Sequence, residues 1–211
     1  MILDLSHPIH TDMTIYPGDP EVSLDFGAGG EGPWRVSALR LGSHSGTHID
    51  APSHLAPGRL TIDALPLERF VGLGTIFDLQ SLDDDAPIAL EHLSPALSTP
   101  RPADFALLRT GWDRHWGREP YLRHPYLSRE LAQALAEAGF TLIGVDALNV
   151  DSTVQGTSHA HEILLGKEIL IVENLTGLDR LLAGHIYQFA FFPLRLAGAD
   201  GSPVRALTWI V

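Results

Sequence analysis

The segment from His44 to His54 constrains this chain more than any other stretch. It reads HSGTHIDAPSH, so three histidines and one aspartate fall within eleven residues. Neutral imidazole and carboxylate are ligands for zinc, manganese or iron. The chain contains no cysteine, which excludes disulfides, thiolate nucleophiles, iron–sulfur clusters and Cys-type zinc sites. Any metal chemistry of this chain therefore rests on imidazole and carboxylate groups.

A regular helix is disfavoured in this segment, because it contains Gly46, two β-branched residues and Pro52. In an extended segment, alternate side chains share one side. The polar groups on that side are His44, His48, Asp50 and His54. Burying such a wall is costly unless metal or hydrogen bonds satisfy it. We therefore favour the interpretation that these four side chains form a functional site. The alternative is that they are surface histidines in a Gly/Pro-rich loop.

Further ligands are expected from a second segment, SHAHEILLG, at residues 158–166. It offers His159 and His161, and Glu173 follows at the end of the apolar run 169–172. Taken alone, Glu173 would be a solvated strand end and either histidine a helix-start residue. The sequence of this segment alone leaves open whether His159 or His161 is a metal ligand.

Short apolar runs dominate the rest of the chain and are typical of strands. They cover residues 34–41, 74–79, 105–109, 141–145, 169–172, 189–194 and 206–211. The run 34–41 alternates as a half-buried strand does. The clearest helix spans residues 128–138, with Ser128 as N-cap and Gly139 as the stop. The pattern predicts an α/β or α+β domain built on a largely β core.

Composition bounds the class of protein. The chain has 211 residues, is 45% hydrophobic, and contains no Gly/Ser- or Pro-rich linker, so we expect a single domain over residues 1–211. Its formal net charge of −12 argues against nucleic acid or an anionic membrane as partner. The sequence contains neither a visible signal peptide nor an apolar stretch approaching the roughly 18 residues of a membrane helix. We expect a soluble, cytoplasmic protein that acts on a small molecule.

The pattern His-x-Gly-Thr-His-x-Asp-x-Pro-x-His resembles the signature of the putative cyclase family of metal-dependent hydrolases. This family includes bacterial kynurenine formamidases and isatin hydrolases. The similarity covers nearly the whole chain. It continues in residues 4–8, 16–19, 109–112, 144–146, 161–165, 173–175, 193–194 and 201–205.

The resemblance implies a swivelling β/β/α fold, a homodimer or homotetramer, and two divalent metal ions per chain, zinc foremost with manganese as the alternative. The metal ligands that it implies are His44, His48 and Asp50 for the first ion, and Asp50, Glu173 and His161 for the second. It assigns the general acid/base to His54. His159 competes with His161, whose spacing to Glu173 fits the family better. From the sequence we expect structural roles for Asp146 and Asp151, and the alternative is contact with the metal ligands.

The resemblance also implies an activity, the hydrolysis of a small aryl amide, with N-formylkynurenine giving kynurenine and formate. Tyr16 stands where kynurenine formamidases of this family have a tryptophan before Pro-Gly-Asp, and a tyrosine can still stack on an aryl ring. The alternative substrates are an isatin-like cyclic amide or a lactone. A non-catalytic metal-binding module is a different class of function. His54 argues against it, because the metal ligand set does not require this residue.

Overall fold

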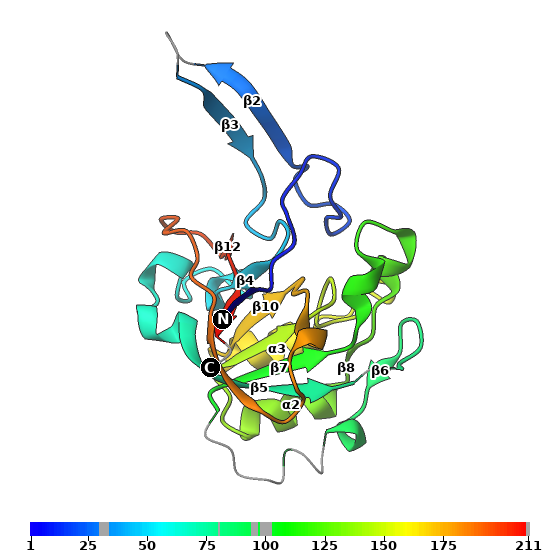
Figure 1. Cartoon of the computed structure of the whole chain (residues 1–211). Helices are drawn as coiled ribbons and strands as arrows, with labels where there is room; N and C mark the ends of the chain where they lie inside the picture. Colours follow the sequence, from blue (N-terminus) through cyan, green and yellow to red (C-terminus); the bar gives the residue numbers. More distant parts are fainter. Residues whose placement is uncertain (30–33, 80, 94–96, 98–102, 210–211) are drawn as a thin grey trace.

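The computed structural model describes residues 1–29, 34–79, 81–93, 97 and 103–209 (Figure 1). In that part of the chain a nine-stranded sheet has the order β1-β13-β11-β5-β7-β9-β10-β4-β12. Its strands are β1 (Ile2–Asp4), β4 (His48–Asp50), β5 (Val71–Asp78), β7 (Phe105–Arg109), β9 (Leu142–Val145), β10 (Leu170–Glu173), β11 (Ile186–Ala190), β12 (Gly201–Pro203) and β13 (Leu207–Trp209).

The centre of the sheet is parallel, and its flanks are antiparallel. Strands β5, β7, β9 and β10 run parallel, whereas β4 and β12 on one side and β11, β13 and β1 on the other pair antiparallel. Apolar clusters cover both faces of the central strands, which explains their continuous apolar sequences. The curled sheet with few helices confirms the predicted α/β class with a largely β core.

Two α-helices pack on one face of the sheet, α2 (Arg129–Glu137) and α3 (His159–Gly166). The predicted helix over residues 128–138 is confirmed. The Ser128 side chain accepts a hydrogen bond from the Leu131 N–H (3.2 Å), and Gly139 follows with a φ of +86°. None of the helices in the described part of the chain is long and apolar enough to cross a membrane.

Short elements connect the sheet strands. The remaining strands are β2 (Ser23–Gly29), β3 (Val36–Arg40), β6 (Pro87–Ile88) and β8 (Tyr126–Leu127). The 3₁₀ helices are Pro52–His54, Ile62–Ala64, Leu67–Phe70, Leu90–His92, Trp112–His115, Glu119–Arg123 and Leu178–Arg180.

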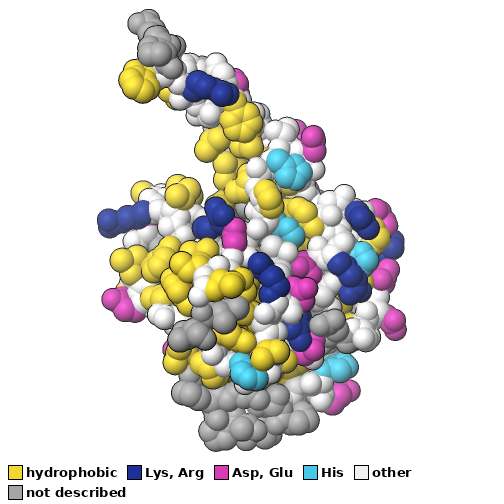
Figure 2. Space-filling model, in the orientation of Figure 1, with side chains coloured by type: hydrophobic (Ala, Val, Ile, Leu, Met, Phe, Trp, Pro, Cys, Tyr) yellow, Lys and Arg dark blue, Asp and Glu magenta, His cyan; other side chains and the backbone are white. Residues whose placement is uncertain are grey.

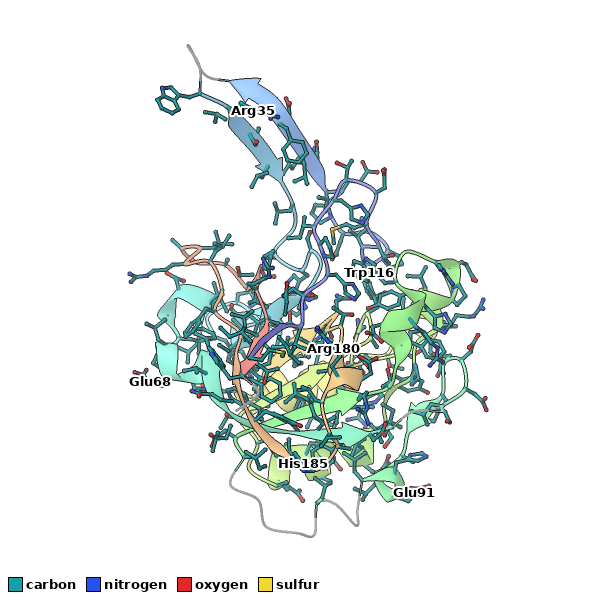
Figure 3. All side chains as sticks on the ribbon, in the orientation of Figure 1. Arg35, Glu68, Glu91, Trp116, Arg180 and His185 are labelled. Carbon is teal, nitrogen blue, oxygen red and sulfur yellow. The ribbon has the colours of Figure 1, made fainter. Side chains whose placement is uncertain are left out.

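Strands β2 and β3 form a hairpin that projects from the body of the molecule (Figure 1). The predicted strand over 34–41 is present as β3, but its predicted half-burial is wrong, because all five residues of β3 are exposed. Figure 2 shows hydrophobic side chains along this hairpin, and the exposed ones include Phe26, Val36 and Leu39. In Figure 3, Arg35 marks the hairpin, which projects beyond the other described elements of the chain.

The C-terminal strands differ from their predicted limits. The predicted strand at 189–194 is β11, which lies earlier, because its pairing with β5 starts at Ile186 and Pro193 supplies no N–H to a ladder. The predicted strand at 206–211 is β13, and residues 210 and 211 lie outside the described part. The four predicted central strands coincide with β5, β7, β9 and β10 to within a few residues.

Gly144 in β9 provides a test of the central packing. A Cβ added at Gly144 would lie within 3.0 Å of side-chain atoms of both Leu107 and Leu175. We expect Gly144→Ala to lower the free energy of unfolding by about 1–3 kcal/mol, because the packed core resists extra volume. The measurement is chemical denaturation. Gly29→Ala is the control, since its added Cβ would meet nothing within 4 Å. Equal stability of the two variants would contradict this packing.

Candidate metal centre

Strand β4 lies between β10 and β12 and places two motif residues on the sheet. In the β4–β10 register His48 lies opposite Glu173, and Asp50 lies opposite Ile171. Alternation directs His48, Asp50 and Glu173 to one face of the sheet. This face is the one that α3 covers, because Ile171 belongs to the same apolar cluster as the buried residues of α3. Ile49 points to the opposite face and is fully buried there.

The predicted continuous extended wall from His44 to His54 is wrong in its backbone. Gly46 has a φ of +68°, and a 3₁₀ helix begins at Pro52, so only His48–Asp50 is a strand. The chain therefore turns on both sides of β4. These turns still bring the outer histidines together, with the ring centroids of His44 and His54 4.0 Å apart.

His161 enters the same region from the first turn of α3. Asp151 accepts hydrogen bonds from the backbone N–H groups of Ala160 and His161, both at 3.0 Å, as favourable acceptors at a helix start do. The His161 Nδ1 lies 2.9 Å from the same carboxylate. Its Nε2 then faces Asp50 Oδ2 and Glu173 Oε1, both at 3.6 Å. The Asp151 carboxylate thus accepts hydrogen bonds from the first turn of α3 and also orients the His161 imidazole.

His159, the competing candidate, is directed elsewhere. Its Nε2 lies 2.7 Å from the Leu127 carbonyl oxygen, and its Nδ1 lies 3.4 Å from Asp151. Both ring nitrogens are therefore engaged away from Asp50 and Glu173. The geometry therefore favours His161 over His159 as the histidine of α3 that joins His48, Asp50 and Glu173. These four residues are called the cluster below.

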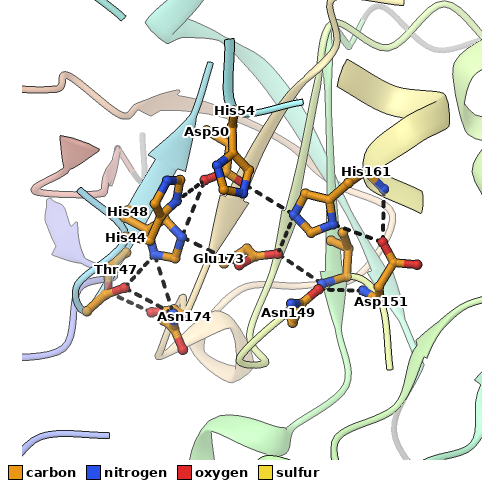
Figure 4. Close-up of polar contacts among 12 residues, drawn as sticks. His44, Thr47, His48, Asp50, His54, Asn149, Asp151, His161, Glu173 and Asn174 are labelled. Carbon is orange, nitrogen blue, oxygen red and sulfur yellow. Dashed lines mark hydrogen bonds and ion pairs between the residues drawn. The ribbon is translucent and has the colours of Figure 1, made fainter. Parts of the chain in front are cut away.

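The donor atoms of this cluster converge at distances that suit a shared ion (Figure 4). The His48 Nε2 lies 3.4 Å from Asp50 Oδ1 and 3.5 Å from Glu173 Oε2. Two ligands of one tetrahedral ion, each about 2.0–2.1 Å from it, stand about 3.3–3.4 Å apart. Asp50 Oδ2 is buried without a hydrogen-bond partner among the described residues. The residues present therefore fit a divalent metal.

Buried hydrogen bonds fix the backbone around His48. The His48 Nδ1 lies 2.8 Å from the Gly46 carbonyl, which can only accept, so a neutral His48 presents the lone pair of Nε2 to the cluster. Asn174, in the left-handed region at a φ of +57°, donates to the same carbonyl (3.0 Å). Tyr121 donates to the Asn174 side chain and Thr47 to its carbonyl. Only the place of Asn174 directly after Glu173 pointed to it in the sequence.

The charges of the cluster shift its pKa values strongly. Burial lowers the pKa of His48, but Asp50 and Glu173 outweigh burial and raise it to about 10. Burial likewise opposes charge on His161, yet Asp151 and Asp50 raise its pKa to about 10. Burial raises the pKa of Asp50, but His44 and His161 hold it well below its usual range. Without a metal, protonated imidazoles therefore neutralise the buried carboxylates.

Asp200 was not predicted from the sequence. Its Oδ2 lies 3.1 Å from His44 Nε2 and 3.2 Å from His54 Nδ1. It comes just before β12, the edge strand that pairs with β4. Its separation from His54 by 146 residues hid this contact. The available signal was its position next to the motif segment 201–205.

A cavity of about 360 Å³ opens over the cluster. His44, His48, His54, His161 and Glu173 line it, and Tyr16 stands in the same wall. Leu55 and Leu148 give the cavity an apolar part. All predicted site residues except Asp50, which is fully buried beneath them, thus border one cavity.

Metal binding should compete with protons. Because His48 and His161 have pKa values of about 10 without metal, both carry a proton at pH 7, and a metal ion must displace it. We expect Zn²⁺ affinity to rise between pH 6 and 8, by up to about tenfold per pH unit for each proton displaced. Competition with a chromophoric chelator measures this. His92→Gln, at an exposed site, should behave like the wild type, whereas a pH-independent affinity would contradict the assignment.

Comparisons with known proteins identify the family of this chain. The family model described as "Putative cyclase" matches residues 3–152. A kynurenine formamidase of Paracidovorax citrulli is 33% identical over 98% of this chain and 95% of its own length. A structure described as a potential metal-dependent hydrolase with cyclase activity is 26% identical, with a TM-score of 0.83 over 99% of this chain and 96% of its own.

An isatin hydrolase A from Labrenzia aggregata, solved with benzyl benzoate, has the same fold, with a TM-score of 0.86 at 24% identity over 99% of this chain and 93% of its own. A match of the family model to most of the chain and a relative above 30% identity over nearly its full length are sufficient to assign the family. This chain belongs to the cyclase family.

Proposed function

We propose that this protein is a metal-dependent hydrolase of small aryl amides, and specifically an arylformamidase that converts N-formylkynurenine to kynurenine and formate. The observation that carries the proposal is the buried Asp50 Oδ2, which has no hydrogen-bond partner among the described residues and lies among imidazoles and carboxylates at the base of a cavity that His54 also lines. The names of the relatives support the substrate class. A single hydrolase domain over residues 1–211 and a cytoplasmic location stay predictions.

The metal ligands fall into two overlapping groups. His44, His48 and Asp50 would hold one ion, and Asp50, His161 and Glu173 the other; the donor atoms within each group lie within 4.8 Å of one another, and both groups share the buried Asp50. The donor atoms of His44, His54 and Asp200 lie equally close, but this third group contains neither Asp50 nor Glu173. We propose zinc, with manganese as the alternative, since sites of this ligand type accept both. Such ions, when bound, lower the pKa of water and polarise a carbonyl oxygen.

The side chains of the chain itself supply orientation and proton transfer. His54, with 35% of its side chain exposed, borders the cavity and would donate a proton to the leaving nitrogen as the amide C–N bond breaks. Tyr16 would stack on the aryl ring, and Leu55 and Leu148 would exclude water beside it. An isatin-like cyclic amide or a lactone is the alternative substrate, because the same attack on a carbonyl carbon opens either ring.

The projecting hairpin supports a homodimer. A two-stranded hairpin is marginally stable in water by itself, and the described part of the body leaves Phe26, Val36 and Leu39 of β2–β3 exposed. A second copy presents an identical apolar hairpin, so two hairpins can cover each other about a two-fold axis. We propose this dimer as the basic assembly, and a homotetramer would be a dimer of such dimers.

The assembly is testable by changing the hairpin alone. We expect Phe26→Ser with Leu39→Ser to shift the protein from dimer to monomer in light scattering, because the covered apolar area is lost. Leu67→Ser, at another exposed leucine on the body, serves as control and should leave the dimer intact. A wild-type monomer, or an unchanged dimer in the hairpin variant, would contradict the proposed interface.

The activity is testable with N-formylkynurenine and the metal-loaded protein. We expect turnover that falls about 10²–10⁴-fold in His54→Ala, with metal content unchanged, because general acid–base catalysis has this typical magnitude. Asp50→Asn should instead lose bound metal together with activity, since Asp50 belongs to both ligand groups. Turnover of isatin but not of N-formylkynurenine would show that the substrate is a cyclic amide and not an aryl formamide. Full activity of His54→Ala would contradict the proposed role of His54.

A further inference from the structure

Asp200 contacts His54 from outside the two proposed ligand groups. One carboxylate oxygen, Oδ2, lies 3.2 Å from His54 Nδ1 and 3.1 Å from His44 Nε2. The other, Oδ1, accepts a hydrogen bond from the Ser43 hydroxyl at 2.8 Å. These three polar contacts hold the carboxylate toward the two histidines. His54 is among the described residues that line the cavity, and Asp200 is not.

The backbone ties Asp200 to the element that bears His54. The Ala51 N–H donates to the Asp200 carbonyl, and the Ala51 carbonyl accepts from the His54 N–H, both at 2.9 Å. Gly201 then pairs with Asp50 in the β12–β4 register. A Cβ at Gly201 would lie 2.8 Å from both His44 Cε1 and the Ile49 carbonyl, so only glycine admits this close approach. The spacing between Asp200 and His54 is therefore set by rigid elements, not by a free loop.

We propose that Asp200 is a positioning residue for His54. A carboxylate can only accept, so the contact keeps a proton on His54 Nδ1 and leaves Nε2 as the nitrogen that exchanges protons in the cavity. Nε2 first accepts a proton from the attacking water as the water oxygen forms the new bond to the carbonyl carbon. The same proton then passes from Nε2 to the leaving nitrogen as the amide C–N bond breaks. Asp200 stabilises the cationic ring between these two transfers. The inference rests on the proposed function.

Two substrates with different leaving groups distinguish a positioning role of Asp200 from a merely structural role. Formanilide has a leaving nitrogen that must be protonated, whereas 4-nitrophenyl formate releases a phenolate that needs no proton. With metal-loaded protein, we expect Asp200→Ala to lower kcat for formanilide by about 10–100-fold, with KM within about twofold, because it removes only part of the contribution of His54. For 4-nitrophenyl formate we expect a smaller loss of kcat than for formanilide, because only the proton transfer from the attacking water then depends on His54. Asp200→Asn keeps an acceptor oxygen and should retain more activity than Asp200→Ala.

A matched control and a double variant complete the test. Asp63 is a carboxylate that holds the same loop by accepting from the Gly198 N–H (2.9 Å), but it does not contact His54. Asp63→Ala should leave the ratio of the two rates unchanged. His54→Ala with Asp200→Ala should be no slower on formanilide than His54→Ala, because residues that act as a unit are not additive.

The outcomes distinguish this inference from the proposed function. Wild-type protein that hydrolyses neither substrate would overturn the function, and the role of Asp200 with it. An active wild type with equal losses on both substrates in Asp200→Ala would overturn the positioning role alone. Loss of bound metal in Asp200→Ala would also overturn it, because Asp200 would then act by holding His44. A double variant clearly slower than His54→Ala would show that Asp200 acts independently of His54.

Discussion

The structure depends on burying carboxylates next to imidazoles at the face of a sheet. Asp50 is fully buried and Glu173 nearly so. An unpaired buried carboxylate would be strongly destabilising, so partners must be supplied by the fold. His48 comes from the same strand as Asp50, Glu173 from the neighbouring strand, and His161 from the helix that covers them. The placement of β4 between β10 and β12 and the hydrogen bonds from the first turn of α3 to Asp151 both serve this pairing.

The central strands were predictable because burial on both faces of the sheet requires a recognisable run of apolar residues. Strands β7, β9 and β10 are covered on both faces, so each appears as an uninterrupted apolar run. The hairpin strand β3 was predictable as a strand but not in its burial. Alternation indicates two different faces, yet it does not indicate that a layer will cover one of them.

The site shows the same division between local pattern and distant contact. The motif predicted that His44, His48, Asp50 and His54 meet, although the backbone between them turns at Gly46 instead of running straight. The choice between His159 and His161 needed the position of Asp151, which orients one ring and starts the helix. Asp200 could not be predicted by spacing, because the pairing of β12 with β4, and not sequence proximity, brings it to His54.

Ile49 has a consequence beyond packing. It separates His48 from Asp50 and is buried on the opposite face, where no donor of the cluster lies. The side-chain period of a strand is two, so a slip of one residue would exchange the faces of β4 completely. The imidazole and carboxylate would then lie in the apolar layer, and an isoleucine would stand at the cluster. Burial of the aliphatic Ile49 side chain in the apolar layer therefore determines the face of the sheet on which His48 and Asp50 lie.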